Sequence, residues 1–364
     1  MKLLLRYCSQ FCILFRRKLT MSLSSCWTWK YCRTGPIFCV IGCVLMIYFF
    51  VMDILVFNYI QTMTFLDPPN KGGYSPLRSL SVKLLMMDHM AHYIYNPIAE
   101  AVVTLFEPTG VYHIITPNVI SITGLVLGFV SGKFVSMESL QCRRIGILIF
   151  EYRMWLDVLD GVVFRHTSGN PVYKSHRTSL GFFIDVDCDI FSGVALAFGC
   201  LFYLWKYPPI LASRDLLPQT KPFLSVRGFE DDTPAKFIGT KATKNYIFSK
   251  ALIYGVVIVI ASVTWDNVVQ AYVDLLQTPL ETSIHTEKQT VALHSTVTFL
   301  SMYLWRFGGS QALLNMIQIA VFADKLWEFL NFIQYAGFIG LAMLNCISYI
   351  QIYHLRDVLF VSPS

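Results

Sequence analysis

Charged residues are scarce in this sequence. Asp, Glu, Lys and Arg make up 14% of the 364 residues, against about a quarter in soluble domains. Hydrophobic residues make up 55%, so the composition excludes an ordinary soluble protein and indicates a membrane protein surrounded by lipids. The net charge of +6 is modest and is typical of basic cytosolic loops in such proteins. We therefore expect no nucleic acid among the partners.

Regular cysteine patterns and glycosylation sequons are also missing. Six of the ten cysteines lie within residues 1–43, but their spacings match neither a zinc site nor a disulfide framework. These cysteines either accept palmitate beside the basic residues 16–18 or serve as small apolar side chains near the membrane. No small-residue cleavage site follows the apolar residues 3–15, so a cleaved signal peptide is not expected.

Long apolar runs, in contrast, occur along most of the chain. A helix needs roughly 20 apolar residues to cross a bilayer, and the sequence contains seven candidate spans. The sixth is too long for one straight helix, so we expect it to be tilted or broken at Gly308 and Gly309. The fold class is therefore all-α and polytopic. The predicted spans cover residues 37–57, 117–136, 145–165, 179–205, 248–272, 290–322 and 329–352.

The distribution of basic residues predicts the orientation of these spans. The long polar loop 206–250 carries eight lysines and arginines, and the N-terminus is also basic. Both should be cytosolic by the positive-inside rule, which places the turn 166–178 in the lumen or outside the cell. The expected organisation is a basic cytosolic N-terminus (1–36), a transmembrane helix (37–57), a lumenal or interfacial segment (58–115), a six-span core (116–352) and a C-terminal tail (353–364).

Four aspartates form the most specific polar pattern. Asp157 and Asp160 lie near the end of one predicted span, and Asp185 and Asp189 lie near the start of the next. Spacings of three and four residues put each pair on one helix face, and the intervening turn lets the two faces meet. Carboxylates inside a membrane are costly and therefore point to function. Oxygen ligands suit Mg²⁺ or Mn²⁺, and two such ions can bridge a pyrophosphate while it is cleaved.

Three further residues share these helix faces. Gly161 and Gly181 have no side chain, which allows a nucleotide to approach the helix backbone closely. Arg165 can make a forked contact with phosphate. Asp187 lies two residues off the stripe and should point away from the centre.

The remaining polar groups in and near the spans suggest structural roles. His89 and His92 lack a third metal ligand and are expected on a water-exposed interfacial face. Trp305 and Arg306 are expected to anchor the end of a span at the membrane interface. Arg153 should pair with a nearby acid, either across a helix turn or on a neighbouring segment.

The aspartate pattern resembles the signature of the CDP-alcohol phosphotransferase family, D-x2-D-G-x2-A-R-x8-G-x3-D-x3-D. Residues 116–125, TPNVISITGL, are similar to the start of the first core helix in that family. The chain departs from the signature at Phe164, where the family has alanine, and in the 15 residues rather than eight between Arg165 and Gly181. The first departure bears on the shape of the nucleotide pocket. The second lengthens the turn without disturbing either stripe.

The resemblance implies a six-helix catalytic core and a role for each matched residue. Asp189 would share a metal ion or act as general base on the acceptor hydroxyl. The implied sites are two Mn²⁺ or Mg²⁺ ions held by Asp157, Asp160, Asp185 and Asp189, and nucleotide contacts from Gly161, Arg165 and Gly181.

The extra N-terminal span, the lumenal site and the long turn are most similar to the ceramide phosphoethanolamine synthase branch. That branch implies transfer of phosphoethanolamine from CDP-ethanolamine to ceramide with release of CMP, a preference for Mn²⁺ and a homodimer. It also implies a multi-pass Golgi membrane protein with a lumenal active site, the endoplasmic reticulum membrane being the alternative. Other readings stay open. Diacylglycerol could be the acceptor, with an ethanolamine or choline head group, or CDP-diacylglycerol could be the donor. An inactive polytopic scaffold or transporter is the alternative of another class.

Overall fold

The computed structural model describes residues 35–64, 66, 80–106, 115–168, 180–211, 240–278 and 283–360. Within these residues the chain is helical apart from one short antiparallel pair, β1 (Ile210–Leu211) and β2 (Thr240–Lys241). The expectation of an all-α polytopic protein is confirmed. The helices are α2 (Gly35–Ile60), α3 (Val82–Met86), the π-helix η2 (Ala91–Tyr95), α4 (Asn96–Phe106), α5 (Pro117–Val135), α6 (Leu140–Ser168), α7 (Leu180–Lys206), α8 (Lys244–Leu276), α9 (Ser283–His294), α10 (Thr296–Gly308), α11 (Ser310–Phe322) and α12 (Leu326–Phe360).

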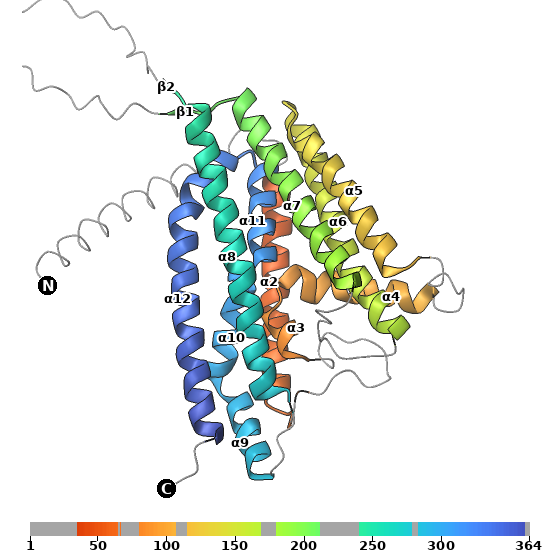
Figure 1. The fold of residues 1–364 in the computed structure, drawn as a ribbon, viewed down its shortest axis with the longest axis vertical. Helices are drawn as coiled ribbons and strands as arrows, with labels where there is room; N and C mark the ends of the chain where they lie inside the picture. Colours follow the sequence, from red (N-terminus) through yellow and green to blue (C-terminus); the bar gives the residue numbers. More distant parts are fainter. Residues whose placement is uncertain are drawn as a thin grey trace, which may run out of the picture.

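The long helices run side by side in one bundle (Figure 1). α5, α6 and α7 pack together on one side, while α8 and α12 pack together on the other, with α2, α10 and α11 between them. The β1–β2 pair lies at one end of the bundle and α9 lies at the opposite end. Since β1 follows α7 directly, the start of α7 and the end of α6 lie in the half of the bundle away from this pair.

Five of the described helices are long and apolar enough to cross a membrane: α2, α5, α7, α8 and α12. The other two predicted spans behave differently. α6 is long, but its charged residues reduce its mean hydropathy below that of a typical span. The run 290–322 is divided into the end of α9, α10 and α11, with breaks at Ser295 and Gly309. The break at Gly309 agrees with the expected one.

Close packing between α5 and α7 depends on residues without side chains. A Cβ atom added to Gly132 would collide with the backbone carbonyl of Ala195, and one added to Gly199 would collide with the carbonyl of Gly132. The two backbones therefore approach each other more closely than side chains would allow, as in other membrane helix pairs. This contact fixes α7, and with it Asp185 and Asp189, against α5.

The described part of the segment after α2, residues 80–106, packs into the helix bundle. α3 packs against α8 and α10, and α4 lies across the long helices against α6 (Figure 1). Leu80, Val82, Leu84 and Leu85 are buried. The weak amphipathic pattern of this segment did not indicate that helices far away in the sequence cover it.

His89, His92, Trp305 and Arg306 are not surface residues either. His92 is 0% exposed, Trp305 0% and Arg306 2%. Arg306 donates a hydrogen bond from Nη1 to Asp53 Oδ1 (2.8 Å), and its Nη2 lies 2.8 Å from His92 Nδ1. His89 Nε2 lies 2.9 Å from Asp53 Oδ2. The histidines predicted on a water-exposed face and the arginine predicted as an interface anchor therefore belong to one buried polar network around Asp53. Ion pairing within this network offsets part of the cost of burying the charges.

Candidate functional site

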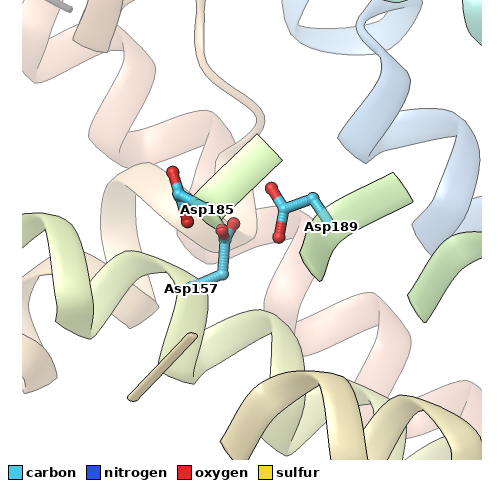
Figure 2. Close-up of side chains that lie close together, drawn as sticks. All are labelled: Asp157, Asp185 and Asp189. Atoms are coloured by element: carbon cyan, nitrogen blue, oxygen red, sulfur yellow. The ribbon is translucent and has the colours of Figure 1, made fainter. Parts of the chain in front are cut away.

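Three of the four predicted aspartates converge on one point. Asp157 on α6 and Asp185 and Asp189 on α7 each offer a carboxylate oxygen, and these oxygens lie within 4.8 Å of one another. Figure 2 shows the three carboxylates turned toward each other, one from α6 and two from α7. The four-residue spacing on α7 places both of its aspartates on the face that meets α6. Asp187 on the same helix is exposed, as its offset predicts.

Asp160 lines the same cavity but is not one of these three residues. Its carboxylate accepts a hydrogen bond from the Ser121 hydroxyl on α5 (2.6 Å), and the residue is 5% exposed. Ser121 belongs to the TPNVIS stretch that resembles the start of the family core helix. The two family-like stretches therefore meet in space, since Ser121 on α5 forms a hydrogen bond with Asp160 on α6.

The two glycines of the motif are not required by packing within the protein. A Cβ atom added to Gly161 would meet only Arg165 Nη1 at 3.5 Å, and one added to Gly181 would meet only Asn118 Oδ1 at 3.5 Å. Both are ordinary contacts, unlike the collisions at Gly132 and Gly199. Packing within the protein therefore does not require glycine at either position, which is consistent with a surface kept free for a ligand.

Basic and amide side chains surround the aspartates. Arg153 on α6 forms an ion pair with Asp189, which gives the predicted local pairing a partner inside the site. Arg165 pairs with Glu100 on α4 (3.6 Å) and lines the cavity beside Gly161. Gln311, at the start of α11, donates a hydrogen bond to Asp157 Oδ2 (2.9 Å). Lys174 and Arg177, in the turn after α6, lie outside the described residues.

A cavity of about 440 Å³ adjoins the aspartates. Besides α6 and α7, it is lined by the end of α3 and the start of α11, and by one turn of α8. Of its charged residues, Lys83, Asp88 and Asp266 lie outside both family-like motifs. A cavity of this size can hold a ligand larger than a metal ion, within the usual range for small-molecule sites.

The chemistry of the donors fits divalent cations. All three clustered donors are carboxylates, the ligand type that Mg²⁺ and Mn²⁺ prefer. Asp185 Oδ1 is buried and has no hydrogen-bond partner within the described residues, so it retains capacity for a metal ion. Without cations, three carboxylates at this separation would repel one another at about 3 kcal/mol per pair for an effective dielectric constant near 20.

Sequence reasoning gave four residues no role in the site. Gln311 and Lys83 reach it from elements far from the aspartates in the chain, so no local spacing indicates them. Ser121 belongs to the family-like stretch 116–125, but its distance from the aspartates in the sequence gave no sign of its contact with Asp160. Arg153 lies four residues before Asp157, on the same helix face as the aspartates. That helical offset was the one available signal.

The sequence match to known proteins covers most of the chain. The family model for ceramide phosphoethanolamine synthase matches residues 70–362, which include α3 and every residue that lines the cavity. Ceramide phosphoethanolamine synthase of Drosophila melanogaster is 30% identical over 294 residues, covering 80% of this chain and 72% of the relative. No solved structure matches the chain.

Proposed function

The chain belongs to the ceramide phosphoethanolamine synthase family, and we propose that it transfers phosphoethanolamine from CDP-ethanolamine to the primary hydroxyl of ceramide. CMP is the second product. The observation that carries this proposal is the convergence of Asp157, Asp185 and Asp189 beside a cavity that Gly161 also lines. Such a site suits a pyrophosphate donor, and the apolar helices around it suit a lipid acceptor.

Bond formation and cleavage balance in one displacement. The ceramide hydroxyl oxygen forms a bond to the β-phosphorus, while the bond from that phosphorus to the bridging oxygen breaks and CMP leaves. Asp157, Asp160, Asp185 and Asp189 would hold two Mn²⁺ or Mg²⁺ ions. These ions supply charge stabilisation for the pyrophosphate when bound.

The protein groups position the donor and remove the hydroxyl proton. Gly161 and Gly181 let the nucleotide lie against the helix backbones, and Arg165 contacts phosphate oxygens. Asp189 accepts the hydroxyl proton, with Arg153 holding its carboxylate in place. Ser121 orients Asp160 toward the site through its hydrogen bond.

We further propose that the site faces the lumen of the Golgi. The site lies in the half of the bundle away from β1–β2, and both of these strands lie within the basic loop 206–250. If that loop is cytosolic by the positive-inside rule, the nucleotide enters from the lumen and the lipid enters from the bilayer. The endoplasmic reticulum membrane is the alternative location.

Purified protein in detergent tests the reaction directly. Labelled CDP-ethanolamine and Mn²⁺ are supplied with either ceramide or diacylglycerol, and both CMP and lipid product are measured. We expect product with ceramide. Product with diacylglycerol alone would assign the chain to phospholipid synthesis, and absence of CMP with either acceptor would refute the transferase proposal.

Matched aspartate variants assign the reaction to this site. Asp185→Asn and Asp189→Ala should each lower kcat by at least about a hundredfold, because each removes a group from the converging cluster. Asp187→Asn makes the same chemical change on an exposed face of α7 and should leave kcat within about twofold. Equal losses from Asp185→Asn and Asp187→Asn would place the chemistry elsewhere.

A further inference from the structure

Lys83 brings a positive charge to the aspartate site from a distant part of the chain. It is half-buried on α3 and lines the cavity that the motif aspartates also line. Its ammonium interacts electrostatically with another cation, Arg165, and with the carboxylates of Asp157, Asp185 and Asp266. Neither family-like motif includes this residue, and the proposed mechanism described above does not use it.

The other residues of α3 are apolar and buried. Four of the five residues of α3, namely Val82, Leu84, Leu85 and Met86, are at most 2% exposed. Burying a lysine among such residues is costly, so a fifth apolar residue would be expected if α3 served packing alone. The cavity is the polar environment that receives the lysine side chain.

Tertiary contacts fix the position of α3. A helix of five residues is too short to be stable alone, so its place must be imposed by its neighbours. Arg306 Nε donates a hydrogen bond to Leu85 O (2.8 Å), and Trp265 Nε1 donates one to Met86 O (3.1 Å). At the other end, Val82 N donates to Gln277 Oε1 (3.3 Å). Side chains from α8, α10 and the residue after α8 therefore hold the backbone on both sides of Lys83.

Charge balance indicates what the lysine meets. Two divalent cations would offset the charge of the four motif carboxylates, so Lys83 is not needed to neutralise them. Asp88 and Asp266 also line the cavity, and Arg165 is paired with Glu100. An anionic pyrophosphate bound at the motif aspartates would meet the Lys83 ammonium in this cavity. Lysine binds phosphate oxygens as a compact point charge.

We propose that Lys83 binds the pyrophosphate of the CDP-alcohol donor and so makes α3 part of the active site. This inference rests on the proposed function. It gives the segment between the N-terminal helix and the core a direct role in substrate binding. The acidic motif holds the metal ions, and α3 supplies a cation that the motif does not contain.

The test compares donor binding with metal binding in the full-length protein. Lys83→Met should raise the KM for CDP-ethanolamine by about tenfold to a hundredfold, since a charge-assisted hydrogen bond is lost. Mn²⁺ affinity, measured without nucleotide, should stay the same or increase, because a positive charge near the carboxylates has been removed. Lys83→Arg keeps the charge and should recover most of the donor affinity. Lys133→Met, at an exposed position on α5, is the control.

A role of Lys83 in donor binding and a structural role predict different changes in Mn²⁺ affinity. A KM within twofold of wild type in Lys83→Met would overturn the proposal, as would a parallel loss of Mn²⁺ and donor affinity in folded protein. If Lys83→Met does not fold, Lys83→Gln and Lys83→Arg are compared instead, and equal donor affinity in these two would overturn it. If the wild type releases no CMP from CDP-ethanolamine, the proposed function fails. Binding of CDP, which carries the pyrophosphate, is then measured with Mn²⁺ present. Weaker binding in Lys83→Met than in wild type and Lys83→Arg would support the proposal, and equal binding in all three would overturn it.

Discussion

The buried pair between Asp53 and Arg306 should be essential for stability. Asp53 is the one acidic residue in the apolar helix α2, and it is 8% exposed. Its carboxylate accepts hydrogen bonds from Arg306 (2.8 Å), the Tyr93 hydroxyl (2.7 Å) and the Tyr303 hydroxyl (3.0 Å), and contacts His89. The pair therefore joins α2 to α10 and to the segment around η2.

Asp53→Asn keeps the size of the side chain and removes its charge. Arg306 would then be a buried cation without its carboxylate partner, and breaking such a pair costs about 3–5 kcal/mol. In a chain of this size, 1 kcal/mol corresponds to roughly 2 °C in melting temperature, so we expect a decrease of roughly 6 °C or more. The assay is thermal unfolding of the purified protein in detergent.

Glu328→Gln is the matched control. Glu328 also pairs with a basic residue, Lys325 (3.2 Å), but these two side chains are 44% and 38% exposed. An exposed ion pair contributes about 0–1 kcal/mol, so the melting temperature should fall by roughly 2 °C at most. Equal decreases in the two variants would refute the reasoning that burial of the Asp53–Arg306 pair determines the cost.

Three further outcomes are expected. Gly132→Ala should lower the melting temperature because the added Cβ would collide with the carbonyl of Ala195. Gly193→Ala is the control: nothing lies near its Cβ, so it should be neutral or stabilising by up to about 1 kcal/mol. Ser121→Ala should lower kcat by about tenfold because Asp160 loses its hydrogen bond, and Ser121→Thr should retain activity. Chelation should abolish CMP release and added Mn²⁺ should restore it; activity that persists through chelation would exclude the metal-assisted reaction.

The sequence predicted much of the architecture because apolar runs and helical offsets are local properties. The runs at 37–57, 117–136 and 329–352 correspond to α2, α5 and α12. The four-residue spacing between Asp185 and Asp189 placed both on the face that meets Asp157. These inferences needed only the helix period and the length of a span.

The rest depends on contacts between distant segments. The direction of the Asp160 carboxylate is set by Ser121, which is 39 residues away in the chain. The burial of Arg306 depends on Asp53, which is 253 residues away. An arginine beside a tryptophan at the end of an apolar run has the same local pattern whether it meets lipid head groups or a buried acid. Local sequence therefore could not distinguish the two environments.

One residue connects stability to the proposed donor site. Arg306 pairs with Asp53 on α2 through Nη1 and holds the Leu85 carbonyl on α3 through Nε. Leu85 is two residues from Lys83. The Asp53–Arg306 pair therefore connects α2 to α3, the helix that carries the lysine proposed to bind pyrophosphate. Removal of α2 would leave Arg306 without its carboxylate partner and free to move away from α3. We therefore expect the N-terminal helix to support the proposed donor site, although this helix lies outside the range matched by the family.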